Sequence, residues 1–240
     1  PVTVTDGLIG DVTGNLTGNV TGNLTGNVTG AINGLTPQAS NMQPHNLIIN
    51  GAMTVAQRGT SASGVTANGY HTLDRWRLIA SGATLNTSQQ EFTLGQTDVP
   101  SQFKYFQRIE VTTGDNNAGV DYRIEDVTTI SGETVTLSFY AKGTNPAGGN
   151  MDLHCTQNFG SGGSTAVTTL IDTYVLTSSW QRFTFTFTIP SISGKTVGTS
   201  SFIQIDNRQP DADTGTAAWT LDFTGVQLEA GSTASPFAHE

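Results

Sequence analysis

Apolar and polar residues alternate with a fixed period near the start of the chain. From residue 10 to residue 36 a glycine stands at every fourth position, and one apolar residue lies midway between successive glycines. Side chains of an extended strand alternate between two faces, so the glycines and the apolar residues share one face while Asn and Thr share the other. The apolar positions are Val12, Leu16, Val20, Leu24, Val28 and Ile32. A single ribbon cannot bury that face, so we predict that residues 1–36 form a repetitive β shaft in which these six residues pack against neighbouring copies.

Other regular structures fit this tract poorly. A glycine at every fourth position is unfavourable in an α-helix, and the collagen triple helix needs glycine at every third position. A solenoid made from one chain would have only about three short coils, which is few for independent stability. We therefore expect identical chains to assemble around an axis, with a homotrimer as the favoured closed arrangement.

The pattern changes after residue 36. Residues 37–45 contain two prolines and no alternation, which predicts a linker. From residue 46 to residue 240, short stretches of alternating apolar and polar residues are separated by turn-rich segments such as "NPAGGN" and "GSGGS". We predict strands at 46–53, 74–80, 104–112, 121–127, 134–142, 152–159, 181–189, 201–207 and 218–230. Short strands divided by turns are typical of an all-β fold, here a two-sheet β-sandwich of the jelly-roll kind.

Composition agrees with this all-β interpretation. Only 12% of the residues are charged, whereas a helical protein needs Glu, Lys and Arg on its exposed faces. Lys and Arg together number 10 against 19 acidic residues, for a net charge of -9. Such a surface repels phosphate backbones and anionic lipid. No apolar run approaches the roughly 20 residues of a membrane-spanning helix. We therefore expect no nucleic-acid partner and no membrane insertion.

The sequence contains no recognisable catalytic motif. The patterns G-x-S-x-G, H-E-x-x-H and G-x-x-x-x-G-K-[ST] are absent. Glu125 and Asp126 are adjacent, so on a strand their side chains would point to opposite faces rather than work as an acid–base pair. The single cysteine, Cys155, lies in a strand-like stretch and is expected to be a small buried residue. We predict that the protein is not an enzyme.

Sugar binding is the chemistry that the residues favour. Sugars have apolar C–H faces and many hydroxyl groups, so proteins bind them with aromatic rings and polar side chains. Tyr70, His71 and Trp76 follow a Gly, Ser and Thr-rich loop at 59–69, and we take them with Tyr122 as candidate carbohydrate-binding residues. Seven arginines against three lysines favour subunit contacts. Binding of sugar acids by these arginines is an alternative.

Three stretches of the second part carry a family resemblance. They are "NLIINGAMTVAQRGTS" followed by "LDRWRL", then "SSWQRFTFTFTIP", and finally "GVQLEAGSTASPFAHE". In this order they resemble the jelly-roll domains, related in fold to carbohydrate-binding modules, that lie at the ends of bacteriophage tail fibres and related receptor-binding proteins. The resemblance covers residues 46–240.

The resemblance implies a role in the virion. On this interpretation residues 46–240 are the receptor-binding tip of a tail fibre, and the partners are a host surface polysaccharide or lipopolysaccharide and other virion tail proteins. The alternative is a purely structural cap or adaptor that does not bind the receptor itself. Location in the virion follows from either interpretation.

The resemblance also raises the question of a structural calcium ion. In related sugar-binding jelly rolls an acidic residue tends to follow an opening Asn-Gly pair, whereas this chain has Ala52 there. Asp222 remains in the last expected strand, and Asp211 and Asp213 stand in a D-x-D-x-G run. Clustered oxygens of this kind suit calcium, so these three residues are the candidate metal ligands. We expect no cofactor, with a structural calcium as the alternative.

Overall fold

The computed structural model describes residues 46–80, 82–114, 117–210 and 215–239. The predicted shaft (1–36), the predicted linker (37–45) and the candidate ligands Asp211 and Asp213 lie outside the described residues. No helix among the described residues is long and apolar enough to cross a membrane.

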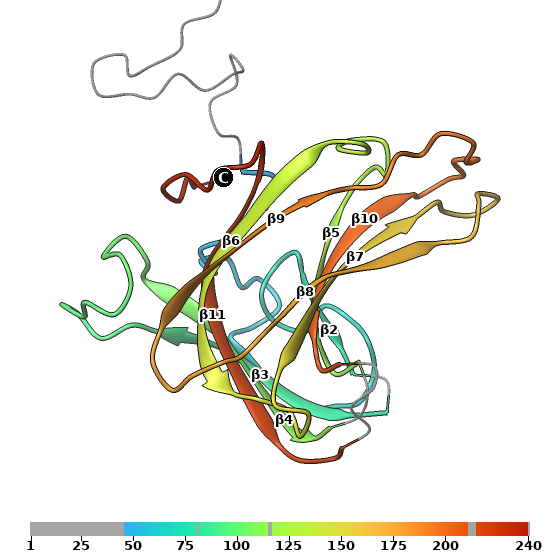
Figure 1. Ribbon diagram of the computed structural model, residues 1–240. Coiled ribbons are helices and arrows are strands. Elements are labelled where there is room, and N and C mark those ends of the chain that lie inside the picture. Colours follow the sequence, from blue (N-terminus) through green and yellow to red (C-terminus); the bar gives the residue numbers. More distant parts are fainter. Residues whose placement is uncertain (1–45, 81, 115–116, 211–214, 240) are drawn as a thin grey trace, which may run out of the picture. The chain divides into compact units, whose positions relative to one another are not determined.

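The described part of the chain is built from β-strands, and no helix occurs in it. The strands are β1 (Ser61–Val65), β2 (Trp76–Ile79), β3 (Thr84–Glu91), β4 (Tyr105–Thr113), β5 (Gly119–Ile124), β6 (Thr134–Thr144), β7 (Met151–Asn158), β8 (Val167–Tyr174), β9 (Gln181–Thr188), β10 (Phe202–Arg208) and β11 (Trp219–Ala230). They form two antiparallel sheets, a six-stranded one in the order β1-β3-β4-β11-β6-β9 and a five-stranded one in the order β2-β5-β10-β7-β8. Figure 1 shows β6, β9 and β11 on one side of the fold and β5, β10 and β7 on the other. The all-β prediction is confirmed, and the architecture is a jelly-roll-like β-sandwich.

Alternation along each strand creates the core between the two sheets. On β6 the inward residues Val135, Leu137 and Phe139 are buried, and on β11 the buried Phe223 and Leu228 lie opposite Ala141 and Leu137 of β6. Because successive side chains of a strand point to opposite sides, every strand that supplies this core also presents a second set of side chains to the outside of the sandwich. The outer faces are therefore where a binding surface can form.

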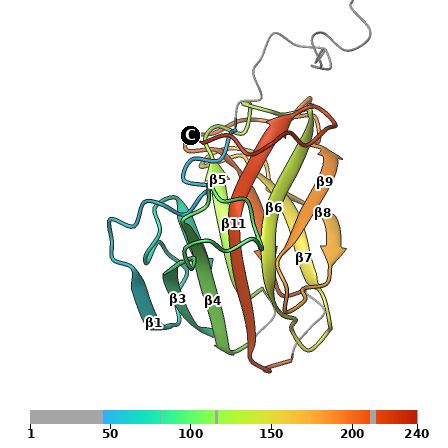
Figure 2. The same ribbon diagram turned by 90° about the vertical axis from the view of Figure 1, so that its left-hand side faces the viewer.

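The outer face of the six-stranded sheet is partly covered by the chain itself. Figure 2 shows this sheet face on, from β1 to β9. Phe103, in the loop between β3 and β4, packs against Phe237 near the C-terminus, with ring centroids 4.9 Å apart. Below it β11 has a bulge at Gly225, whose φ is 61°, and a Cβ there would lie 2.5 Å from the Phe103 ring. We call this surface the covered face.

One predicted strand is wrong. Residues 46–53 do not form a strand, because Asn50 and Met53 both have positive φ angles, 61° and 58°. This segment lies across β11 instead: the Leu47 amide donates to the Leu228 carbonyl (2.9 Å), and the Val226 amide donates to the Gly51 carbonyl (3.0 Å). Asn-Gly here makes a turn against the bulge of the last strand.

The other eight predicted strands correspond to β2, β4 to β7 and β9 to β11. The sequence pattern missed β1, β3 and β8. In β3 the inward side carries the buried Thr87 next to Leu85, and Thr87 accepts a hydrogen bond from Gln107 Nε2 (2.9 Å). A polar residue at an inward position hides the alternation on which the prediction depends.

Candidate functional site

A polar groove crosses the outer face of the five-stranded sheet. Strand register sets its charged residues in rows, since Arg77 on β2 lies opposite Asp121 on β5, and Asp121 lies opposite Asp206 on β10. In the next row Arg123 lies opposite Gln204, and Gln204 lies opposite Thr156 on β7. The residues that line the groove are Asn68, Arg77, Ile79, Gly82, Asn117, Arg123, Thr156, Thr168, Gln204, Asp206 and Arg208.

The groove residues are joined by hydrogen bonds and ion pairs. Arg77 Nη1 donates to Asp121 Oδ2, and Arg123 Nε donates to Gln204 Oε1 (3.0 Å). Gln204 Nε2 in turn donates to Asp206 Oδ1 (2.6 Å). Asp121 Oδ1 also lies 3.6 Å from Arg123 Nε, and Asp206 Oδ2 lies 3.9 Å from Arg208 Nε. Connected partners of this kind hold side chains in one orientation before a ligand arrives.

A glycine makes room for one of these arginines. Gly119 lies opposite Arg208 in the register of β5 and β10. A Cβ at residue 119 would lie 2.6 Å from the Arg208 Cα and 2.7 Å from its Cβ. Any larger residue at this position would therefore push β10 away from β5 at one end of the groove.

The carboxylates lie deeper than the arginines. The Asp121 side chain is fully buried and that of Asp206 is 6% exposed, while the side chains of Arg77 and Arg123 are 17% and 29% exposed. Burial raises the pKa of Asp121 to about 6, against the opposing effect of the Arg77 charge. Burial likewise raises the pKa of Asp206, although Gln204 and the arginines act to lower it. Asp121 Oδ1 is buried and accepts no hydrogen bond from any described residue.

Aromatic rings contribute little to the groove. Phe202 at the start of β10 is half-buried, and the Arg123 guanidinium carbon lies 4.2 Å from its ring centroid. Two of the predicted sugar-binding rings lie elsewhere: Trp76 and Tyr122 are 5% and 1% exposed and pack against each other at 5.1 Å inside the sandwich. Neither leaves a ring face open to a ligand, which corrects the expectation for these two residues.

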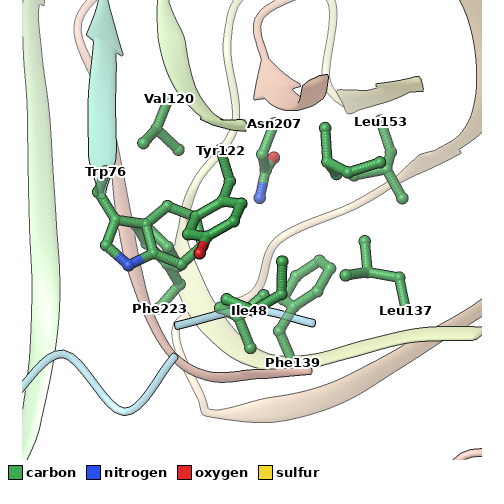
Figure 3. A pocket seen from close by; sticks show the side chains of 11 residues that line it. Ile48, Trp76, Val120, Tyr122, Leu137, Phe139, Leu153, Asn207 and Phe223 are labelled. Carbon is green, nitrogen blue, oxygen red and sulfur yellow. The ribbon is translucent and has the colours of Figure 1, made fainter. Parts of the chain in front are cut away.

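The sandwich interior has no room for a sugar between these rings. Figure 3 shows Trp76, Tyr122, Ile48, Phe139 and Phe223 around a void between the sheets. Its volume is about 20 Å³, which is about the space that one water molecule needs.

Tyr70 and His71 lie beside the groove rather than in its lining. An isolated bridge between Gly69 and Leu78 places their loop alongside β2, and Asn68 of the same loop lines the groove. Tyr70 is 41% exposed, with the Arg58 guanidinium 5.6 Å from its ring centroid. The role of these two residues in sugar binding stays a prediction.

The metal candidate that falls on a described residue has another partner. Asp222 is buried and accepts two hydrogen bonds of 2.7 Å from Arg108, one on each oxygen. Within the described ranges no group of three or more His, Cys, Asp or Glu residues could hold a metal ion. Cys155 is buried as expected, and burial raises the pKa of its thiol to about 12, so it stays protonated and unreactive.

The sequence analysis did not predict the residues of this groove as a binding site. The signal that could have found them is the alternation in three predicted strands, where Arg77, then Asp121 and Arg123, then Gln204 and Asp206 occupy every second position. Strand order is what brings these positions together, and strand order is not readable from alternation.

Comparison with known proteins adds one finding about this region. Residues 86–202 match a carbohydrate binding domain. The matched segment contains Asp121, Arg123, Thr156 and Phe202 of the groove region, while Arg77 and residues 204–208 lie outside it. No curated protein matches the sequence.

Solved structures of several kinds are similar to the chain at low identity. A xylan-binding domain from Paenibacillus barcinonensis is 14% identical over 71% of this chain and 98% of that one, with a TM-score of 0.42. The enzymatically active domain of tailspike protein 4 from bacteriophage CBA120 is 12% identical, with a TM-score of 0.43 over 78% of this chain and 21% of that one. A Stig cyclase from Fischerella sp. is 12% identical over 80% of this chain and 100% of that one, with a TM-score of 0.48.

Proposed function

We propose that this protein is a non-enzymatic glycan-binding protein and that the polar groove is its binding surface. The observation that carries the proposal is the connected set of charged and amide side chains that crosses adjacent strands of one open sheet face. The match of residues 86–202 to a carbohydrate binding domain supports it independently.

The groove chemistry suits a ligand rich in hydroxyl groups. A hydroxyl both donates and accepts, so a sugar needs donors and acceptors close together. Arg77 and Arg123 supply N–H donors, Asp206 supplies carboxylate oxygens, and the Gln204 amide supplies both kinds of group. Because Gln204 connects Arg123 to Asp206, it holds a donor and an acceptor at neighbouring positions along the groove.

The larger setting that we propose is a bacteriophage tail fibre. The G-N-V/L-T repeat of residues 1–36 would form a trimeric shaft, and residues 46–240 would form the tip that binds a polysaccharide or lipopolysaccharide on the host surface. Three weak sites on one stalk act together, because once the first has bound, the others bind at a high effective concentration. The protein would reside in the virion and contact other tail proteins. The resemblance in three sequence stretches and the predicted self-association of the repeat support this setting.

Binding to bacterial surface polysaccharides tests the proposed function. We expect the full chain to bind at least one member of a panel of capsular and lipopolysaccharide glycans. Gln204→Ala should weaken that binding about tenfold, the usual effect of removing a hydrogen-bond partner of charged groups. The matched control is Thr184→Ala on the exposed outer side of β9, which should bind as the unmodified protein does.

Three outcomes would contradict parts of this proposal. Absence of binding to any glycan or host cell would favour the structural cap or adaptor. Release of reducing ends from a bound polysaccharide would show an enzyme. A monomer of the full chain by light scattering would exclude the trimeric fibre while leaving glycan binding intact.

A further inference from the structure

We infer that the polar groove selects sugars that carry a carboxylate group, and that Arg123 is the residue that determines this selectivity. The inference rests on the proposed function, because it names the class of glycan that the same groove would bind. Three observations support it. The groove exposes arginine more than carboxylate, the terminal amino groups of Arg123 have no protein partner among the described residues, and the groove has few aromatic rings.

The groove presents positive charge to solvent although its formal charges balance. Arg77, Arg123 and Arg208 lie on the outer face with Asp121, Asp206 and Asp152. The side chains of Asp121 and Asp206 are 0% and 6% exposed, against 29% for Arg123. An approaching ligand therefore meets guanidinium groups first, with the carboxylates beneath them.

Arg123 presents an open pair of donors. Its Nε atom is occupied by Gln204 Oε1 at 3.0 Å and lies 3.6 Å from Asp121 Oδ1. Among the described residues, its two terminal amino groups donate to no protein acceptor. The Phe202 ring, 4.2 Å from the guanidinium carbon, supports the guanidinium against one face. A guanidinium held in this way is a ready bidentate donor for a planar carboxylate.

The other arginines are less free to play this part. Arg77 Nη1 is paired with the buried Asp121, and Arg208 Nε donates to His154 Nδ1 (3.3 Å) and is itself buried. On the covered face, Arg108 has the same bidentate chemistry, but its Nε and Nη2 atoms already donate to Asp222. That pair is an example, within this molecule, of a guanidinium bound to a carboxylate by two hydrogen bonds; for Arg123, whose Nε is occupied by Gln204, we assign the two bonds to the terminal amino groups.

The scarcity of rings argues against a neutral sugar stacked on an aromatic platform. Outer positions of the five-stranded sheet carry Phe202 and His154 as their rings within the described strands; His154 is 6% exposed, and Phe202 is half-buried beneath Arg123. Neutral glycans depend on stacking of their C–H faces on exposed aromatic side chains. Because the groove exposes arginine instead of an aromatic ring, it favours a ligand that it can bind by charge-assisted hydrogen bonds.

The experiment compares matched pairs of oligosaccharides on the full chain. Oligogalacturonate and oligoglucuronate are each measured beside their carboxyl-reduced counterparts, and a sulfated neutral oligosaccharide separates carboxylate from general anion binding. We expect the acidic member of a pair to bind at least about tenfold more tightly than its reduced form, since hydrogen bonds to charged groups are among the stronger ones. Its affinity should also fall as salt is added.

Arg123→Lys is the decisive variant because it keeps the charge and removes the bidentate donors. We expect it to lose about tenfold in affinity for the acidic oligosaccharide and little for the reduced one. Arg182→Lys, on β9 of the other sheet and outside the groove lining, is the matched control and should change neither. Thermal unfolding of both variants shows whether each is folded.

Two results would overturn the inference without touching the proposed function. One is equal binding of acidic and reduced oligosaccharides, and the other is preferential binding of the sulfated sugar with no effect of Arg123→Lys. If the thermal unfolding of Arg123→Lys differs from that of the unmodified protein, Phe202→Leu, which removes the supporting ring and keeps the arginine, must show the same selective loss; equal losses for both sugars would again overturn it. Failure to bind any glycan at all would instead count against the proposed function.

Discussion

The outer faces of the two sheets both carry acidic side chains below the surface, but they satisfy them in different ways. On the covered face Glu229 is 1% exposed and accepts hydrogen bonds from the Ser235 amide (3.1 Å), the Ser235 hydroxyl (3.2 Å) and the Gln227 side chain. On the groove face Asp121 is equally buried, yet its Oδ1 atom accepts no hydrogen bond from a described residue. The Glu229 carboxylate is therefore fully hydrogen-bonded within the fold, whereas the Asp121 carboxylate lies beneath an open surface.

This difference separates polar groups that only stabilise the fold from polar groups that belong to the proposed binding groove. Buried polar groups normally have hydrogen-bond partners, and those that lack one need a separate explanation. Glu229 fixes the segment after β11 against the sheet, so its role ends with folding. Asp121 instead holds Arg77 in the groove and lies near Arg123, so it positions groups that face the solvent. The comparison therefore predicts that changes on the two faces affect different properties.

The largest effect should come from Glu229→Ala on the covered face. The substitution leaves the buried Ser235 amide without an acceptor, which costs about 1 to 3 kcal/mol. It also removes one hydrogen bond each from the Ser235 hydroxyl and the Gln227 amide, at about 1 kcal/mol apiece, although the Pro236 carbonyl (3.2 Å) and Ser235 Oγ (2.9 Å) remain as their acceptors. We expect the free energy of unfolding to fall by about 3 to 5 kcal/mol in urea titrations. Glycan affinity of the remaining folded protein should not change; a loss of binding at constant stability would contradict the division between the faces.

A pH-dependent effect should follow from Asp121→Asn on the groove face. The pKa of Asp121 is raised from 3.8 to about 6 in the folded protein, so the folded state holds the proton more tightly than the unfolded state. The stabilising contribution of protonation is therefore complete below pH 3.8 and is lost as the pH rises through 6. A shift of this size corresponds to about 3 kcal/mol.

Urea titrations at pH 4 and pH 7 measure this effect. Relative to the unmodified protein, Asp121→Asn should gain up to about 3 kcal/mol of stability between pH 4 and pH 7, because asparagine does not titrate. If the stabilities of the two proteins changed in parallel across this pH range, burial would not be the main influence on the pKa of Asp121. Such a result would remove one of the contrasts between Asp121 and the fully satisfied Glu229.

Alternation along the chain predicted most of the fold but little of the groove. Stretches such as 134–142 and 181–189 alternate without interruption and became β6 and β9. At 46–53 the alternation was misleading because the positive φ angles of Asn50 and Met53 are a backbone property that apolar spacing does not reveal. The groove was missed because Arg77, Asp121 and Asp206 become neighbours only through the pairing of β2, β5 and β10.

The two buried candidate rings, Trp76 and Tyr122, were misplaced for a related reason. Trp76 stands between two arginines in the sequence, and Tyr122 stands between Asp121 and Arg123. One residue of shift on a strand exchanges the inner and outer faces, so the polar neighbours of each ring, rather than the ring itself, lie on the outer surface. Trp76 and Tyr122 thus lie on strands whose outer residues line the proposed groove, but their own rings are buried inside the sandwich.

The smallest effect should come from Arg108→Lys on the covered face, which makes it a sensitive comparison with Arg123→Lys in the groove. Arg108 is 37% exposed and gives two hydrogen bonds of 2.7 Å to Asp222. Lysine keeps the charge but not the bidentate geometry, and a partly exposed pair contributes about 1 kcal/mol or less. We expect a stability loss of that size by urea titration and unchanged binding of acidic oligosaccharides. If Arg108→Lys weakened acidic-sugar binding as much as Arg123→Lys, the general charge of the protein, and not the open donors of the groove, would be responsible for the selectivity.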